Sequence, residues 1–447
     1  MGRSKFFHHG QEWKPRIIEI EYTEEKLTAA AGIDPLVDLF VESPQFEELK
    51  KCLPKRVSNA SYETAHLALT FIAGFLRGAD SLDDLERIGT DALMEAKFGS
   101  MPSARALGDY LRDFSAENLS ELNTLLHKQA HSCRKKLTNN APVIDIDSTS
   151  HVQSGEKIEG VAYNYKNEWC LDSLSAFDEL GLCHALELRP GNTFSAQGAV
   201  PLIERAFKNY SFRDEKYLRA DSAFCNEAVI RRCVSLGIGF SITAHGNMNW
   251  ESHMTEITNW EPWKFSEDRI KENLDLPRIE IGSFVHQPSW AESLRLFVIV
   301  KRTWVEKEDL FGEGHWKYYG VITNRSLKTM QELMEFHHKR GNCENFIREE
   351  KYGYDLKHFP CLKLSANHAY GLLAMVAHNF LRTIGILENP KKPKFSRRLR
   401  YEFVHIPGHL IRHARGLTLK IPKIYAQEVS RIIQAWRSTP YPSLNTG

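Results

Sequence analysis

Two aspartates lie two residues apart in a short run that is otherwise mostly apolar and β-branched, Pro142-Val143-Ile144-Asp145-Ile146-Asp147-Ser148-Thr149. The alternation of a β-strand would place Asp145 and Asp147 on one face and the two isoleucines on the other. A carboxylate on a strand whose other face is buried is poorly solvated, so it needs a bound cation, a basic side chain or a hydrogen-bond donor. Taken alone, the stretch is equally compatible with a turn in which Asp147 caps the residues that follow.

A third acid ends another strand-like segment, because Asp221 directly follows residues 216–220. If the two strands are parallel neighbours, Asp147 and Asp221 lie side by side at the same end of a sheet, where α/β folds place ligands. Two carboxylates held this close repel each other, so one of them is protonated unless a divalent cation neutralises the pair. Oxygen ligands that leave room for phosphate oxygens favour Mg²⁺ or Mn²⁺.

Further along the chain, Arg340, Glu344 and Lys351 follow one another at intervals of four and seven residues. These intervals place all three on one face of a helix predicted from residue 326 to 348, if the helix runs that far. Each pair read alone is equally typical of a surface ion pair. A helix packed beside the two strands would add Glu344 to the aspartates. Three acids can bind two metal ions about 3.5–4 Å apart, the arrangement used in phosphodiester cleavage. Arg340 and Lys351 would then contact backbone phosphates.

The segments around the acids predict the sheet that positions them. Three strands are followed by a helix, a strand, a second helix and a fifth strand, in the ranges 143–147, 168–177, 183–188, 199–208, 216–220, 226–236 and 239–243. This order matches the mixed sheet of the ribonuclease H-like fold, in which helices form right-handed crossovers between parallel strands. We therefore predict an α/β protein with a ribonuclease H-like core at 142–244 and 324–390.

The remaining segments differ in character from this core. Residues 1–136 have a helical pattern, which is compatible with a helix-turn-helix-like DNA-binding domain or with a plain packing bundle. Residues 245–323 are rich in tryptophan and strand-like, which predicts a β-rich insertion. The region 391–447 is basic, with ten basic residues between Lys391 and Lys423 against a single acid. Such a surface suits DNA contact or dimerisation, and its candidate DNA contacts are Arg397, Arg398 and Arg400.

Whole-chain properties restrict the class of protein. The formal net charge is +1 over 447 residues, so any nucleic-acid surface must be local. The eight cysteines form no C-x-x-C pair, so neither a zinc site nor a disulfide framework is expected. No signal peptide or membrane-spanning run is recognised, and we expect a cytoplasmic protein without a membrane partner.

This ordered set of residues resembles the DDE transposases of bacterial insertion sequences, in the branch with a Y-R-E-K signature. The signature is Tyr, two residues, Arg, three residues, Glu, six residues and Lys. Its last three positions match Arg340, Glu344 and Lys351, whereas His337 occupies the Tyr position. The family's acids correspond to Asp147, Asp221 and Glu344, with Asp145 as the alternative for the first place.

The resemblance implies an enzyme that binds two Mg²⁺ (or Mn²⁺) ions per active site through these acids. It implies two double-stranded DNA partners, the terminal inverted repeats of its own element and a target, bound by a homodimer at the bacterial nucleoid. Nicking would free a 3′-hydroxyl that attacks a second phosphodiester, in cut-and-paste movement for which the resemblance leaves a hairpin intermediate open. The alternatives are a metal-dependent nuclease without strand transfer, a non-catalytic DNA-binding protein derived from a transposase, and a structural protein.

The resemblance also implies DNA contacts outside the acids. In related enzymes a tryptophan of the insertion stacks on a base that is flipped out beside the cleavage site. Trp316, which precedes the strand leading into the long helix, is the expected residue here, with Trp290 and Trp304 as its substitutes. Arg340, Lys351 and His337 are expected to contact DNA as well. Most tryptophans of such a sheet are core residues, which is the simpler interpretation of each.

Overall fold

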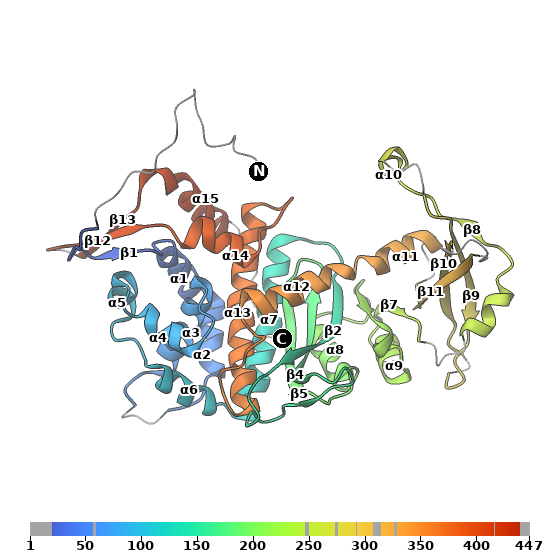
Figure 1. Cartoon of the computed structure of the whole chain (residues 1–447), viewed down its shortest axis with the longest axis horizontal. Coiled ribbons are helices and arrows are strands. Elements are labelled where there is room, and N and C mark those ends of the chain that lie inside the picture. The colour runs from blue at the N-terminus through green and yellow to red at the C-terminus, as the bar shows by residue number, and fades with distance from the viewer. Residues whose placement is uncertain are drawn as a thin grey trace, which may run out of the picture.

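The computed structural model describes residues 20–56, 60–245, 250–272, 276–291, 293–306, 314–325, 329–414 and 416–438. The molecule is elongated, with a helical body at one end and a group of strands at the other (Figure 1). A mixed sheet joins the two ends and positions the predicted aspartates.

The central strands of this sheet have the predicted order. Side by side they are β5 (Cys183–Pro190), β4 (Trp169–Asp178), β2 (Val143–Val152), β6 (Tyr217–Ala220) and β7 (Gly239–Thr243). β4 is antiparallel to both of its main neighbours, while β2, β6 and β7 run parallel. The predicted mixed α/β architecture is therefore confirmed.

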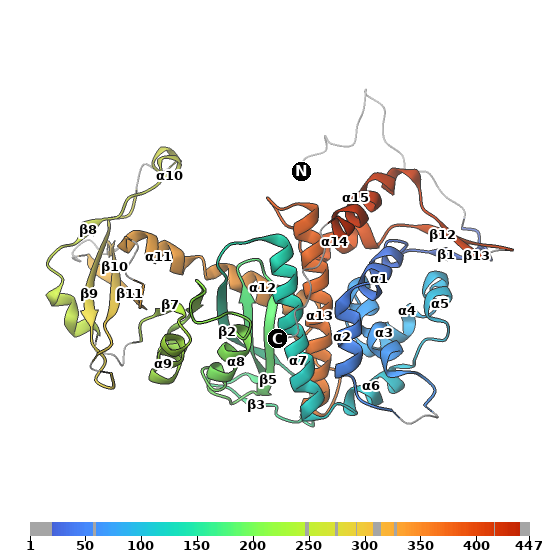
Figure 2. The ribbon, with the colours of Figure 1, turned by 180° about the vertical axis from the view of Figure 1, so that it is seen from behind.

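Helices cover both faces of these strands. The crossover helices α8 (Ala199–Ala206) and α9 (Glu227–Ser235) pack on one face, against Ile144 and Ile146. α12 (Gly341–Gly353) packs on the opposite face, where its Phe346 ring contacts Phe177. Figure 1 shows α12 in front of the sheet, and the reverse view in Figure 2 shows α8 in front. The face that carries Asp147 is thus the face covered by α12.

The β-rich segment continues the same sheet beyond β7. Its last strand pairs antiparallel with β7, through partners such as Ile322 and Ile242. Its elements are η3 (Trp250–Glu256), β8 (Glu261–Pro262), α10 (Glu267–Glu272), β9 (Ile279–His286), β10 (Leu296–Val305) and β11 (His315–Thr323). The core and these outer strands therefore form one extended hydrogen-bonded sheet.

The helix predicted for residues 326–348 consists of two helices in the structure. α11 (Met330–His338) ends before α12 begins, and Arg340 occupies the N-cap position of α12. Tight i→i−3 bonds make the junction, since the amide of Arg340 donates to His337 and that of Cys343 donates to Arg340. The prediction of one continuous helix was wrong, and Arg340 lies at a helix junction instead of on a helical face.

The first and last described parts of the chain form one helical body. The N-terminal elements are β1 (Leu27–Thr28), α1 (Ile33–Val41), α2 (Pro44–Cys52), α3 (Thr64–Arg77), α4 (Leu82–Ile88), α5 (Ala92–Phe98), α6 (Ala104–Arg112) and α7 (Ala116–Leu137). The C-terminal elements are α14 (Ser396–Leu399), η4 (Arg400–Val404), β12 (Gly408–His413), β13 (Gly416–Lys420), η5 (Lys423–Tyr425) and α15 (Ala426–Arg437). β1 pairs with β12, so the N-terminal and C-terminal regions share a small sheet.

The long helix α13 (Leu364–Glu388) is the centre of this body. It is long and apolar enough to cross a membrane by length and composition, but 94% of its most apolar window is buried within the fold. Phe380 contacts Phe40 of α1 and Trp436 of α15, with ring centroids 5.3 and 4.7 Å apart. α13 is therefore a core helix, in keeping with its apolar sequence.

Arg400 does not occupy the exposed position that a DNA contact requires. Its side chain is buried, and its guanidinium donates to the carbonyls of Phe75 at 2.6 Å, Leu76 at 3.3 Å and Gly353 at 2.6 Å. Two of these carbonyls belong to the last turn of α3, where helices leave acceptors unsatisfied. The prediction that Arg400 contacts DNA is corrected: Arg400 joins the C-terminal region to α3 and α12.

We expect Arg400→Ala to lower the free energy of unfolding by about 2–4 kcal/mol, because three buried carbonyls lose a charged donor. Thermal denaturation of the purified protein measures the effect. The matched control is Arg397→Ala, an exposed position on α14, which should change stability by less than about 0.5 kcal/mol. Equal stabilities for the two variants would contradict this role for Arg400.

Candidate active site

The parallel pairing of β2 with β6 brings two of the predicted acids together. Their register pairs Val143 with Tyr217 and Asp145 with Arg219. The same offset, continued by two residues, places Asp147 opposite Asp221. Asp221 lies just after β6 and caps η1 (Ser222–Phe224), accepting a hydrogen bond from the amide of Ala223 at 2.9 Å. The two carboxylates thus share one edge of the site.

Asp145 is fully engaged by its cross-strand partner. Arg219 makes a bidentate ion pair with it, with Nε–Oδ1 and Nη2–Oδ2 distances of 2.6 and 2.7 Å, and both side chains are buried. Burial raises the pKa of Asp145 to about 6 despite the opposing effect of Arg219. Arg219 also donates to the carbonyl of Phe336 at 2.9 Å. Asp145 is therefore part of a structural ion pair.

Asp147 instead faces the junction of α11 and α12. Its Oδ2 lies 3.1 Å from Nη1 of Arg340, and its Oδ1 accepts a hydrogen bond from the amide of Ser148 at 2.9 Å. Burial raises the pKa of Asp147 to about 6, Arg340 opposes this rise, and Asp221 adds to it. Although burial lowers the pKa of Arg340, the nearby Asp147 and Asp221 raise it overall. The two acids and one guanidinium form a single electrostatic group.

Glu344 does not join this group in the structure. It lies in the first turn of α12, is exposed, and forms no hydrogen bond or ion pair with the described residues. Within the described part of the chain, no three His, Cys, Asp or Glu side chains lie close enough together to hold a metal ion. The predicted set is thus brought together at Asp147, Asp221 and Arg340, and Glu344 remains on the surface.

A comparison with known protein families identifies the family to which the chain belongs. The family described as Transposase DDE domain group 1 matches residues 12–436, nearly the whole chain. The chain belongs to this family of DDE transposases. It is therefore an enzyme that cuts and joins DNA phosphodiesters. A search of curated proteins found no significant match.

The acid pair of this transposase fits the divalent metal that DDE enzymes use. Asp147 and Asp221 supply hard oxygen ligands, which Mg²⁺ and Mn²⁺ prefer. Their carboxylates already require a positive charge, and Arg340 supplies it here. The donor chemistry of the two aspartates therefore fits a cation, whereas Glu344 would have to approach them.

Next to Lys351, α12 carries a buried polar group that the sequence analysis missed. Glu350 is fully buried and accepts a hydrogen bond from the hydroxyl of Ser173 at 3.2 Å. That hydroxyl also lies 2.7 Å from Nε2 of His151. Burial raises the pKa of Glu350 to about 7 and lowers that of His151 to about 3. Both side chains are therefore neutral between about pH 3 and pH 7. Continuing the alternation of the first strand would have placed His151 on the face of Asp147.

Lys351 itself is only partly exposed. Burial lowers its pKa, while Glu350, Glu168 and Asp172 oppose that change. Its charge therefore lies among carboxylates, on the same face of α12 that packs toward the sheet.

His337, at the Tyr position of the signature, is buried. One ring nitrogen lies 3.0 Å from both the hydroxyl of Thr243 and that of Tyr319, and the other lies 3.1 Å from the hydroxyl of Ser241. Burial, together with Arg340, lowers the pKa of His337 to about 3. A neutral, enclosed imidazole has no surface to offer to DNA in this structure. His337 instead ties the end of α11 to β7 and β11.

The tryptophans predicted to contact DNA belong to the β-rich segment and not to the strands that carry the aspartates. Trp316 packs against Trp304 and Arg302, with centroid distances of 5.2 and 4.4 Å. The other substitute, Trp290, lies 4.6 Å from the guanidinium of Arg231. These rings already have cation or aromatic partners, so base stacking by Trp316 stays a prediction.

The C-terminal candidates differ among themselves. Arg397 and Arg398 are both exposed on α14, and Arg398 forms an ion pair with Glu402. Their contact with DNA stays a prediction, in contrast to that of the buried Arg400.

We expect Asp145→Ala to lower the free energy of unfolding by about 3–5 kcal/mol, because it leaves the Arg219 guanidinium buried without its partner. Replacing both residues, in Asp145→Ala with Arg219→Met, should recover most of that loss. Thermal denaturation of the variants measures the coupling, with Asp147→Asn as the control. Additive effects of the two substitutions would show that Asp145 is not held by Arg219.

Proposed function

We propose that the protein is a transposase of the Y-R-E-K branch, with a ribonuclease H-like core and Asp147, Asp221 and Glu344 as its catalytic acids. The observation that carries this proposal is the register of β2 and β6, because its offset, continued by two residues, sets Asp147 level with Asp221. The strand order and the crossover helices support the proposed core. Asp145 is the weaker candidate for the first acid, since Arg219 occupies both of its oxygens.

The guanidinium of Arg340 lies beside Asp147, where the two aspartates require a positive charge. We propose two Mg²⁺ or Mn²⁺ ions per active site, with Glu344 completing the ligands. Such ions would polarise the phosphate and lower the pKa of the attacking water or hydroxyl. Once the acids are neutralised in this way, Arg340 is free to leave Asp147 and to bind a backbone phosphate. Lys351 provides a second positive charge on the same helix.

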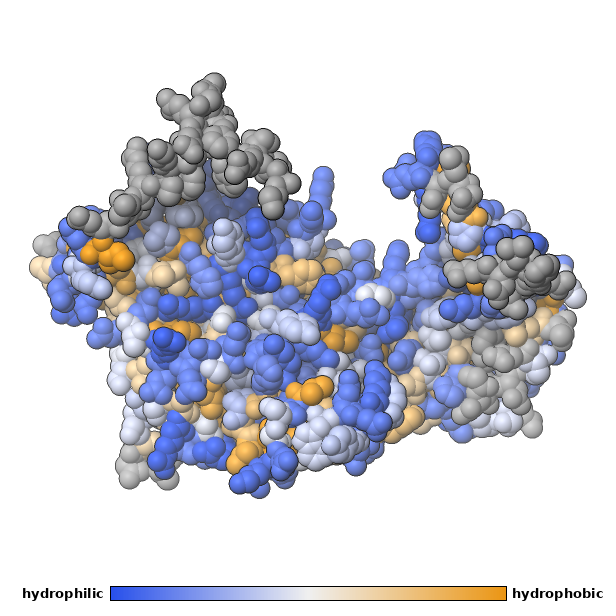
Figure 3. Space-filling view, viewed as in Figure 1, coloured by the Kyte–Doolittle hydropathy of each residue, from blue (hydrophilic) through white to orange (hydrophobic). Residues whose placement is uncertain are grey.

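The shape of the molecule supports a DNA partner on the α12 side. In the space-filling view a wide indentation opens between the helical body and the outer strands, above the position at which Figure 1 draws α11 (Figures 1 and 3). The surface on this face is mainly hydrophilic (Figure 3). Exposed Glu344 and Arg348 of α12 lie toward solvent. We propose that duplex DNA binds on this hydrophilic side, on which Glu344 is exposed.

The proposed partners are the terminal inverted repeats of the protein's own element and a target duplex, held by a homodimer on paired ends at the bacterial nucleoid. Arg397 and Arg398 are proposed phosphate contacts at the edge of the helical body. The first reaction frees a 3′-hydroxyl, and this hydroxyl then attacks a second phosphodiester. A nuclease that stops after the first reaction is the alternative that shares every feature of the site.

The experiment uses DNA that carries the sequences flanking the reading frame on both sides, with Mg²⁺ or Mn²⁺ present. We expect Asp147→Asn, Asp221→Asn and Glu344→Gln each to slow cleavage by roughly a hundredfold or more, because each removes a proposed ligand of the metal ions that would activate the phosphate. The control is Glu335→Gln, an exposed acid on α11, which should cleave normally. Normal cleavage by the two aspartate variants would refute the proposed site.

Strand transfer separates the transposase from the nuclease. With labelled ends and a supercoiled plasmid as target, the wild-type protein should yield joined products that depend on a free 3′-hydroxyl. Cleavage without any joined product, under conditions in which the ends remain bound, would favour the nuclease.

A further inference from the structure

The buried face of α12 contains a carboxyl group. Its other buried members are Cys343, Phe346, Ile347 and Gly353, whereas Glu350 is 0% exposed. An apolar side chain would fill this position at a lower free-energy cost, because a buried carboxyl group loses its hydration. One of its oxygens, Oε2, has no hydrogen-bond partner among the described residues. The stability of the fold alone therefore does not account for a glutamate here.

Glu350 reaches the central strands through Ser173 of β4. The hydroxyl of Ser173 donates to Oε1 of Glu350 at 3.2 Å and lies 2.7 Å from Nε2 of His151 on β2. That Nε2 is 3.7 Å from Oε1 of Glu350, and the imidazole packs against the ring of Phe359 with a centroid distance of 5.3 Å. This cluster therefore joins α12 to β4 and to β2, the strand that carries Asp147.

A second polar contact joins the start of α12 to the same strands, the ion pair of Arg340 with Asp147 at 3.1 Å. In the proposed function this contact is released when metal ions neutralise the aspartates. Apolar packing is not directional, so the rest of the buried face specifies the rotation of the helix only weakly. The hydrogen bond between Glu350 and Ser173 is directional, and it does not involve Arg340.

The neighbouring Glu349 holds α12 on its other side. Its Oε1 accepts hydrogen bonds from the amide of Ser396 at 2.9 Å and from the hydroxyl of the same residue. Ser396 begins α14, which belongs to the helical body. Two consecutive carboxyl groups thus fix α12 between the helical body and the sheet, where Figure 1 shows it in front of the strands.

The rotation of α12 decides where its polar side chains point. Glu344 and Lys351 lie nearly on one line along the helix, because seven residues make almost two turns. Glu350 precedes Lys351 by one residue and is therefore turned away from that line by about 100°. Holding Glu350 toward the sheet sets the direction in which both Glu344 and Lys351 project.

We propose that Glu350 is a positioning residue, whose hydrogen bond to Ser173 fixes the rotation of α12 and hence the approach of Glu344 and Lys351 to the DNA. The inference rests on the proposed function, which gives Glu344 and Lys351 their roles. Glu350 is enclosed within the fold, so it acts through the helix and not on the DNA.

The kinetic test compares two substitutions in single-turnover cleavage of the flanking DNA with Mg²⁺. Glu350→Met keeps the length of the side chain but has no oxygen, and Glu350→Gln keeps an acceptor for Ser173. We expect Glu350→Met to slow cleavage roughly tenfold or more, because small misplacements of catalytic groups are costly. Its Kd for the DNA should change by less than about twofold. Glu350→Gln should cleave at nearly the wild-type rate.

Thermal denaturation shows whether the loss of activity follows from a loss of stability. Glu350→Met should melt at or above the wild-type temperature, since replacing a buried charged or polar group by an apolar one of similar volume is often neutral or stabilising. Ile347→Met places the same new side chain on the same buried face but keeps the hydrogen bond, and it should cleave at the wild-type rate.

Ser173→Ala removes the donor from the side of the sheet and provides a second variant if Glu350→Met does not fold. It should slow cleavage as Glu350→Met does, and the double variant should be no slower than either. Wild-type cleavage by Ser173→Ala would overturn the proposal. An equal loss in Glu350→Gln or in Ile347→Met would overturn it as well.

A distance measurement tests the position of the helix without catalysis. Spin labels are attached to cysteines placed at Arg348 of α12 and at Lys208 after α8, two exposed positions. The background is Cys225→Ser, because the other seven cysteines are buried. With Mg²⁺ present, electron–electron double resonance should give one narrow distance distribution for the otherwise wild-type protein and a broader or shifted one for Glu350→Met.

The two measurements separate two failures. An unchanged distance distribution in Glu350→Met would refute this inference, whatever the activity of the aspartate variants. Normal cleavage by Asp147→Asn and Asp221→Asn, with the distribution broadened in Glu350→Met, would refute the proposed function and leave the structural role of Glu350 in place.

Discussion

Two like charges are held side by side by the parallel ladder between β2 and β6, and the rest of the site compensates for this constraint. The register is enforced from both faces of β2. Ile144 and Ile146 must face α8 and α9, because a slip of one residue would turn them toward α12. Asp145 and Arg219 are register partners and also an ion pair, so their attraction favours the same alignment that brings Asp147 to Asp221.

The repulsion between the two aspartates is offset at the junction of α11 and α12. Arg340 leaves the junction toward Asp147, while Glu344 begins the next helix and faces solvent. His337 anchors the other side of the junction through hydroxyls of β7 and β11. In the proposed mechanism Glu344 takes the place of the guanidinium beside Asp147, and metal binding would favour that state because the ion brings its own positive charge.

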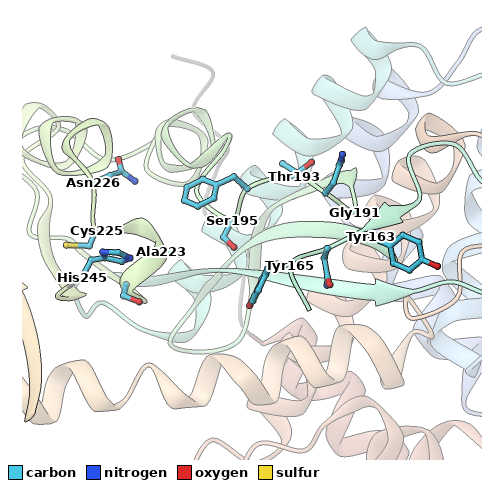
Figure 4. Close-up of a pocket in the computed structure, with 13 residues that line it drawn as sticks. Tyr163, Tyr165, Gly191, Thr193, Ser195, Ala223, Cys225, Asn226 and His245 are labelled. Carbon is cyan, nitrogen blue, oxygen red and sulfur yellow. The ribbon is translucent and has the colours of Figure 1, made fainter. Parts of the chain in front are cut away.

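The parts of this account that sequence could predict are those set by local patterns. Strand alternation predicted the faces of Asp145 and Asp147, and the order of elements predicted the mixed sheet. The break before Gly341 was missed because tight i→i−3 turns keep nearly the same spacing as a helix. Arg400 looked like its exposed neighbours, since only tertiary contacts show that it reaches α3. A cavity lined by Tyr165, Phe194 and Ala223 is formed by three loops distant in sequence, which no local pattern reveals (Figure 4).

The central claim is that Asp147 and Asp221, rather than Asp145, form the metal site. Mn²⁺ binding, followed by electron paramagnetic resonance of the free ion without DNA, tests this claim apart from activity. The account predicts that Asp147→Asn and Asp221→Asn weaken Mn²⁺ binding by about tenfold or more, while Asp145→Asn, where it remains folded, binds like the wild type. Wild-type affinity in both Asp147→Asn and Asp221→Asn, with loss in Asp145→Asn, would contradict the account.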